Sequence, residues 1–262
     1  MLVKSFLLVW PLAGLTPMMA FAQFSESAPP PPPIPGRAGA PVDLTGTWVS
    51  VVSEDWRWRM TTPLKGDAAS IPYKPAARTL IDAWDPEKDT VAGLECKAYG
   101  APAIMRLPGR VRISWQDENT LKIELDQGHQ TRLFHFSARP SQAPAPSWQG
   151  YSTARWEPAA APLGNGLPVG ISPRFSARSR SLEVSTADLR EGYLRKNGVP
   201  YSDKTTLTEY YDLFQDPNGD NWFTVTTIVT DPVYLYTPFV TTTDFKKEAD
   251  GRKFSPAPCA AR

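Results

Sequence analysis

The stretch that decides the fold is Asp43-Leu-Thr-Gly-Thr-Trp-Val-Ser-Val-Val-Ser-Glu-Asp-Trp-Arg-Trp-Arg-Met60. It begins with turn-forming residues, passes through a Gly-x-Trp step and ends in a strict alternation of apolar and charged residues. Because successive side chains of a strand point to opposite faces, the alternation predicts a strand with one apolar and one charged face. The apolar face would carry Trp56, Trp58 and Met60, and the charged face Asp55, Arg57 and Arg59. A strand of this kind requires a curved sheet.

The segment before this stretch has the composition of a targeting sequence. Residues 1–22 carry a single charge, at Lys4, then an apolar run and the sequence Ala20-Phe-Ala22. This pattern predicts a cleaved secretory signal peptide, and its prolines make a retained membrane-spanning helix the less favoured alternative. We therefore expect a soluble periplasmic or secreted protein without a membrane span.

Residues 23–42 are rich in proline and include an unbroken run at Pro29–Pro33. Such a segment is extended and has no core of its own, so we expect a tether; a ligand for a proline-binding module is the alternative. Residues 43–262 would then form one β-barrel domain, a length that suits a single all-β fold.

Charge and cysteine content narrow the possible functions. The chain has a formal net charge of +1, which gives no indication of nucleic-acid binding. Its only cysteines are Cys96 and Cys259, which in an exported protein most simply form one disulfide, with free thiols as the alternative. A structural zinc site usually needs four nitrogen or sulfur ligands, and the chain has two histidines, so no metal is expected.

The remaining pattern is mostly that of strands. Apolar residues at helical spacing predict one helix, over 75–84, and residues 96–102 and 191–203 are expected to be loops. Two hairpins and four further strands are predicted from alternation and turn residues, at 110–116 with 121–125, 206–214 with 221–230, 129–137, 151–156, 182–186 and 239–246. Consecutive short strands with one short helix and long loops favour an antiparallel up-and-down barrel, which leaves no open edge.

The turn after Leu125 decides which residues face the barrel interior. A three-residue loop, with only Gly128 in the left-handed region, pairs Leu125 with His129 and turns His135 inward. A shorter loop would place Arg132 there instead. We favour the inward His135.

Several motifs resemble known proteins. Thr45-Gly-Thr-Trp48 is similar to the Gly-x-Trp signature of lipocalins, and ordered blocks across residues 43–246 resemble a large group of exported bacterial β-barrel proteins. The main blocks are Asp43-Leu-Thr-Gly-Thr-Trp48 and Cys96-Lys-Ala-Tyr-Gly-Ala-Pro102. The resemblance implies a lipocalin-like barrel and brings no activity. This chain departs from the group's Gly-x-Pro-Arg block, which leaves the role of Arg106 open.

Candidate site residues follow from chemistry. If the tryptophan face lies outside, Asp55, Arg57 and Arg59 could hold an anionic or carbonyl-bearing ligand; otherwise they face solvent. His135 and Glu209 are the candidate acid and base, with structural roles as the alternative, for Glu209 as the partner of an arginine such as Arg112 or Arg106. The aromatic residues that would contact a flat or apolar ligand are Tyr211, Tyr234 and Trp115.

Three functions remain open. The leading hypothesis is a barrel that binds a hydrophobic or aromatic small molecule. The first alternative is an isomerase or lyase that transfers a proton on such a molecule in the barrel cavity, and the second is a structural envelope protein. No serine-nucleophile, phosphate-loop or zinc-protease motif is present, and no cofactor is predicted. Catalysis would require His135 and a carboxylate to meet inside the barrel.

Overall fold

The computed structural model describes residues 36–142, 144–157 and 181–261. The predicted signal peptide and most of the predicted tether lie outside these ranges. The end of the predicted tether contacts the domain: the backbone N–H of Gly36 donates to Asn119 Oδ1 at 3.1 Å, and Trp156 Nε1 donates to the Gly36 carbonyl at 2.7 Å. The ordered contacts of the domain therefore begin before Val42.

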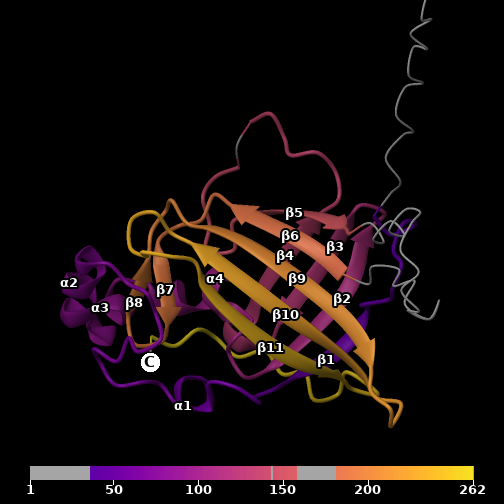
Figure 1. Cartoon of the computed structure of the whole chain (residues 1–262), viewed down its shortest axis with the longest axis horizontal. Coiled ribbons are helices and arrows are strands. Elements are labelled where there is room, and N and C mark those ends of the chain that lie inside the picture. The colour runs from indigo at the N-terminus through magenta and orange to yellow at the C-terminus, as the bar shows by residue number, and fades with distance from the viewer. Residues whose placement is uncertain (1–35, 143, 158–180, 262) are drawn as a thin grey trace, which may run out of the picture. The chain divides into compact units, whose positions relative to one another are not determined.

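Nine strands close into a barrel (Figure 1). Around the barrel they are β1 (Gly46–Val51), β11 (Phe239–Lys247), β10 (Asn221–Thr230), β9 (Thr206–Gln215), β6 (Ser181–Ala187), β5 (Tyr151–Trp156), β4 (Gln130–His135), β3 (Thr120–Leu125) and β2 (Arg110–Asp117). The predicted all-β barrel is confirmed. Its topology departs from a strict up-and-down meander at one place, where β4 and β5 pair in parallel.

A cap of short elements lies at one end of the barrel, on the left in Figure 1. The predicted helix is confirmed as α2 (Pro75–Ala83), and α3 (Pro86–Val91) follows it. The expected loop at 191–203 is instead a hairpin of β7 (Gly192–Arg195) and β8 (Val199–Tyr201). The expected loop at 96–102 contains two short helical segments, η1 (Glu95–Tyr99) and the start of α4 (Ala101–Ile104). Elements of three to six residues are too short to show a periodicity in the sequence.

The predicted strand through residues 55–60 is wrong. β1 ends at Val51, and Trp56–Arg59 forms a single helical turn, α1, after Asp55, which has a left-handed φ of 52°. The backbone N–H of Arg59 donates to the Asp55 carbonyl at 3.1 Å. In a helix, residues 55 and 59 lie one turn apart on the same face. The alternation over these six residues is therefore compatible with a strand and also with a helical turn.

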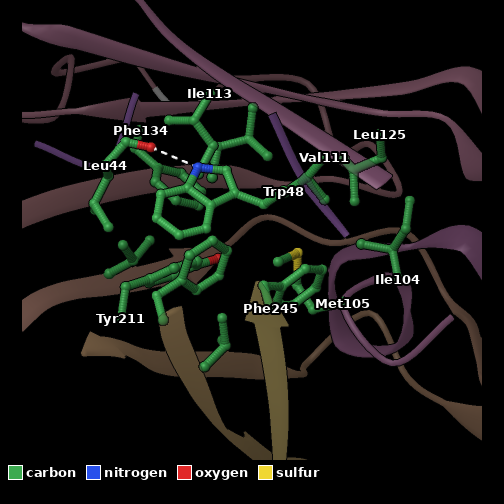
Figure 2. Close-up of a cluster of buried hydrophobic side chains, with 14 of the residues drawn as sticks. Leu44, Trp48, Ile104, Met105, Val111, Ile113, Leu125, Phe134, Tyr211 and Phe245 are labelled. Atoms are coloured by element: carbon green, nitrogen blue, oxygen red, sulfur yellow. Dashed lines mark hydrogen bonds between the residues drawn. The ribbon is translucent and has the colours of Figure 1, made fainter. Parts of the chain in front are cut away.

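The barrel interior is packed with apolar side chains (Figure 2). Trp48 of the Gly-x-Trp step is completely buried, and its Nε1 donates to the Leu44 carbonyl at 2.9 Å. Its ring packs edge-on against Phe223, with centroids 4.8 Å apart, and Phe223 stacks on Phe245 at 4.7 Å. The centre of the barrel is therefore filled by closely packed side chains.

The predicted register between β3 and β4 is also wrong. Leu125 pairs with Gln130 and Ile123 with Arg132, because the connection contains four residues. Gly128 and His129 both adopt positive φ angles, of 70° and 49°. The predicted three-residue loop had only Gly128 in the left-handed region. His129 also adopts this conformation, in which histidine is several-fold enriched.

Candidate functional site

The shift in register places a buried ion pair inside the barrel. Arg132 donates from Nη1 and Nη2 to the two carboxylate oxygens of Glu209 at 2.9 and 2.5 Å, and neither side chain is exposed. Burial alone would lower the pKa of Arg132, but the Glu209 carboxylate outweighs it and raises that pKa. Tyr211 lies beside the pair, with its hydroxyl 3.4 Å from Glu209 Oε1. Glu209 is thus the structural partner of an arginine, and that arginine is Arg132.

His135 lies on the outer face of the barrel. It stacks on Tyr151 with ring centroids 4.7 Å apart, while its neighbour Phe134 is completely buried in the core. Partial burial lowers the pKa of His135, and the Asp117 carboxylate opposes this change. His135 and Glu209 therefore lie on opposite faces of the barrel wall and do not meet, so the geometry that catalysis in the barrel required is not formed.

A different group of charged residues comes together at the capped end of the barrel. Three arginines, from α1, from the segment after α4 and from β7, line a cavity of about 250 Å³. We call this cavity the arginine pocket; its lining includes Trp58, Arg59, Met60, Pro63, Arg106, Leu107, Pro108, Leu194, Arg195 and Lys196.

Two of the arginines are held in place by neighbouring groups. Arg59 and Arg106 are each 6 % exposed. Arg59 donates from Nε to the Arg106 carbonyl at 2.9 Å and pairs with Glu54. Arg106 donates from Nη2 to Asp55 at 2.8 Å. Asp55 thus stands in a left-handed conformation at the start of α1, and its carboxylate pairs with Arg106.

The third arginine is near the carboxylates of Asp55 and Asp67, but neither is within ion-pair distance. Arg195 is 5 % exposed, and none of its three guanidinium nitrogens has a hydrogen-bond partner among the described residues. Its guanidinium lies 4.7 Å from the centre of the Trp58 ring. Burial and the nearby charge of Arg106 lower the pKa of Arg195 to about 10, so it remains protonated at neutral pH. A buried cation without an acceptor is costly, which is typical of a site that receives an anion.

The balance of charge at the arginine pocket is positive. Nη2 of Arg59 and Nη1 of Arg106 are also buried without a partner among the described residues, which makes five such nitrogens with those of Arg195. The carboxylates of Glu54 and Asp55 offset the charges of Arg59 and Arg106, whereas Arg195 keeps its charge. Planar guanidinium groups match the geometry of carboxylates and phosphates. With Trp58 and the apolar lining residues, the pocket can hold an anion that has an apolar body.

The residues predicted from the sequence are distributed over several places. Arg59 lines the arginine pocket and Asp55 pairs with Arg106 of its lining, whereas the side chain of Arg57 is 66 % exposed and pairs with Asp67 at 3.0 Å. Tyr211 lies in the packed barrel interior; Trp115 is partly buried, packs on Phe136 with ring centroids 5.4 Å apart and lines a cavity separate from the arginine pocket. Tyr234 lines a separate cavity.

Arg195 was not predicted from the sequence as a site residue, and the role of Arg106 was left open. Arg195 stands in a segment expected to be a loop, where no spacing links it to Arg59. The Ala101-Pro-Ala-Ile-Met-Arg106 block did single out Arg106, but the pairing of Glu209 with Arg106 or Arg112 was wrong, since Glu209 pairs with Arg132 and Arg106 with Asp55.

The predicted disulfide between Cys96 and Cys259 is present, and it closes a separation of 163 residues. It attaches the C-terminal tail to η1, whose Ala98 lines the arginine pocket. A disulfide is common in exported proteins and rare in the reducing cytosol. Within residues 36–142, 144–157 and 181–261, no helix is long and apolar enough to cross a membrane.

Comparison with protein-family models, with curated proteins and with solved structures found no match to this chain.

Proposed function

We propose that this protein binds a small organic anion, a carboxylate with a flat apolar body, in the arginine pocket. The observation that carries the proposal is Arg195, a buried cation that has no acceptor among the described residues and lies against the Trp58 ring. An anion beside Arg195 would provide the missing acceptor, and a ring on the ligand would pack against Trp58, Leu107 and Leu194.

This proposal keeps the class of ligand expected from the sequence and changes its place. The interior of the barrel holds packed side chains and the Arg132–Glu209 pair, whereas the arginine pocket lies beside the barrel and has room for about one ring with its acidic group. The barrel then acts as a rigid support for the cap. Periplasmic or secreted localisation is part of the proposal and is supported by the disulfide.

The test compares benzoate with benzamide, which have the same shape and differ in charge. By isothermal titration calorimetry we expect benzoate to bind with a Kd of roughly 0.1–1 mM, and benzamide at least about tenfold more weakly, because charge-assisted hydrogen bonds are the stronger ones. Arg195→Met should reduce benzoate binding to the level of benzamide. The matched control is Arg155→Met, since Arg155 is exposed on β5, pairs with Glu183 and lies outside the pocket lining.

Equal binding of benzoate and benzamide to the unaltered protein would contradict the proposal. The remaining reading would then be a structural envelope protein, for which the packed barrel interior and the disulfide are the supporting observations.

A further inference from the structure

A second cavity has a volume of about 290 Å³. Two elements, η1 and β7, contribute lining residues both to this cavity and to the arginine pocket. Gly192 and Tyr193 of β7 line this cavity, whereas Leu194 and Arg195 line the arginine pocket. We call it the aromatic pocket, because four of its lining residues are aromatic: Trp84, Tyr193, Tyr201 and Tyr234. Tyr234, expected from the sequence to contact a ligand, lines this cavity.

The charge at the aromatic pocket is the opposite of that at the arginine pocket. Its lining includes three carboxylates and two lysines. Lys88 pairs with Asp85 at 3.7 Å, and Lys97 pairs with Asp89 at 3.5 Å. Glu191 has no ion-pair partner among the described residues, so one negative charge is left over at the pocket.

The negative charge of Glu191 acts on the aromatic residues that line the pocket. Burial is the first cause of the raised pKa of both Tyr193 and Tyr234; the Glu191 carboxylate is the next cause for Tyr234, and for Tyr193 it adds to the larger effect of Asp89, to which the Tyr193 hydroxyl donates at 2.8 Å. These two hydroxyls therefore stay neutral, and their rings present uncharged faces beside a carboxylate.

The pocket already stabilises one ammonium group against an aromatic ring. Lys97 Nζ lies 5.3 Å from the centre of the Tyr193 ring, within the range of a cation–π interaction. Two further polar groups, Trp84 Nε1 and the Tyr201 hydroxyl, are buried without a hydrogen-bond partner among the described residues. The Tyr201 hydroxyl lies beside Gly192, where a Cβ atom would approach it to 2.6 Å, so glycine at this position leaves space for it.

We propose that the aromatic pocket is a second binding site, and that it takes a small aromatic cation, a single ring bearing a protonated amine. The ring would pack among the tyrosine and tryptophan side chains, and the ammonium group would lie towards Glu191. This site is independent of the proposed anion site, because it uses other side chains and the opposite charge.

The experiment uses three probes with the same phenol ring: tyramine, 4-ethylphenol and 3-(4-hydroxyphenyl)propionate, titrated calorimetrically into the full folded chain. We expect tyramine to bind about three- to tenfold more tightly than 4-ethylphenol, since an exposed ion pair and a cation–π contact each add a modest preference. In the Arg195→Met variant, where the proposed anion site is removed, the propionate should bind most weakly of the three probes. Equal binding of tyramine and 4-ethylphenol, or strongest binding of the propionate to Arg195→Met, would overturn the proposal.

Two variants locate the site. Glu191→Gln should abolish the preference for tyramine over 4-ethylphenol, whereas Glu87→Gln, at an exposed glutamate of α3 outside the pocket lining, should preserve it. Tyr234→Ala should weaken both probes, because it removes one wall of the pocket. Arg195→Met should leave tyramine binding unchanged, so the two proposed sites succeed or fail separately. A tyramine preference that survives Glu191→Gln would place the binding elsewhere and refute the assignment.

Discussion

Replacing Arg195 by methionine should make the protein more stable and less able to bind an anion. The side chain is buried without an acceptor among the described residues, and burial together with Arg106 lowers its pKa from the ordinary arginine value to about 10. Each tenfold change in a protonation equilibrium corresponds to about 1.4 kcal/mol, so the buried charge costs up to about 3 kcal/mol. Methionine keeps an apolar stem against Trp58 but loses the cation–π contact, worth about 1–2 kcal/mol. We expect a net gain of about 1–2 kcal/mol in the free energy of unfolding.

The pH dependence of this effect has a definite sign. A base whose pKa is lowered by folding destabilises the folded state below its folded pKa, and the cost disappears as the pH rises through that value and beyond. The stability gain of Arg195→Met should therefore be complete at pH 7 and should shrink above pH about 10. Urea unfolding at pH 7, with Arg155→Met as the control, measures the gain. A loss of more than about 1 kcal/mol with an unchanged m-value would refute the reasoning, because it would show that Arg195 is well paired.

Three further predictions concern the barrel and its attachments. Glu209→Ala should lower the free energy of unfolding by about 3–5 kcal/mol, because it leaves Arg132 buried and unpaired, and adding Arg132→Met should restore most of the loss; urea unfolding of both variants tests this. Reducing the Cys96–Cys259 disulfide should cost about 2–5 kcal/mol, seen as a lower Tm in dithiothreitol. Since the pKa of His135 is lowered, stability should fall as the pH drops below about 6.5, and His135→Gln should reduce that slope in pH-dependent melting curves.

The barrel was predictable because its strands carry the pattern that buries one face. In the hairpin of β9 and β10, buried residues alternate with less buried ones over 207–211 and 223–229, and the turn contains Asp, Pro, Asn and Gly residues, so its bounds follow from the sequence. The Gly-x-Trp step likewise lies in the first strand of the barrel, as expected, and its Trp48 is completely buried.

Only part of the site could be predicted from the sequence, because the backbone conformation at two places decides which residues come together. The alternation at residues 55–60 fits a strand and a helical turn equally well, and the left-handed backbone of Asp55 selects the turn. One extra residue in the loop before β4 exchanged His135 for Arg132 in the barrel interior. Arg195 reaches the pocket only through the fold of the cap, since no sequence spacing links it to Arg59 or Arg106.

The measurement that tests the anion site most directly is a crystal structure of the protein soaked with 4-bromobenzoate, with data collected at the bromine absorption edge. The account predicts an anomalous bromine peak in the arginine pocket near Trp58, with the carboxylate bound to Arg195 and the Arg195 guanidinium moved to meet it. A bromine peak in the barrel interior or in the aromatic pocket, with the arginine pocket empty at saturating ligand, would contradict it.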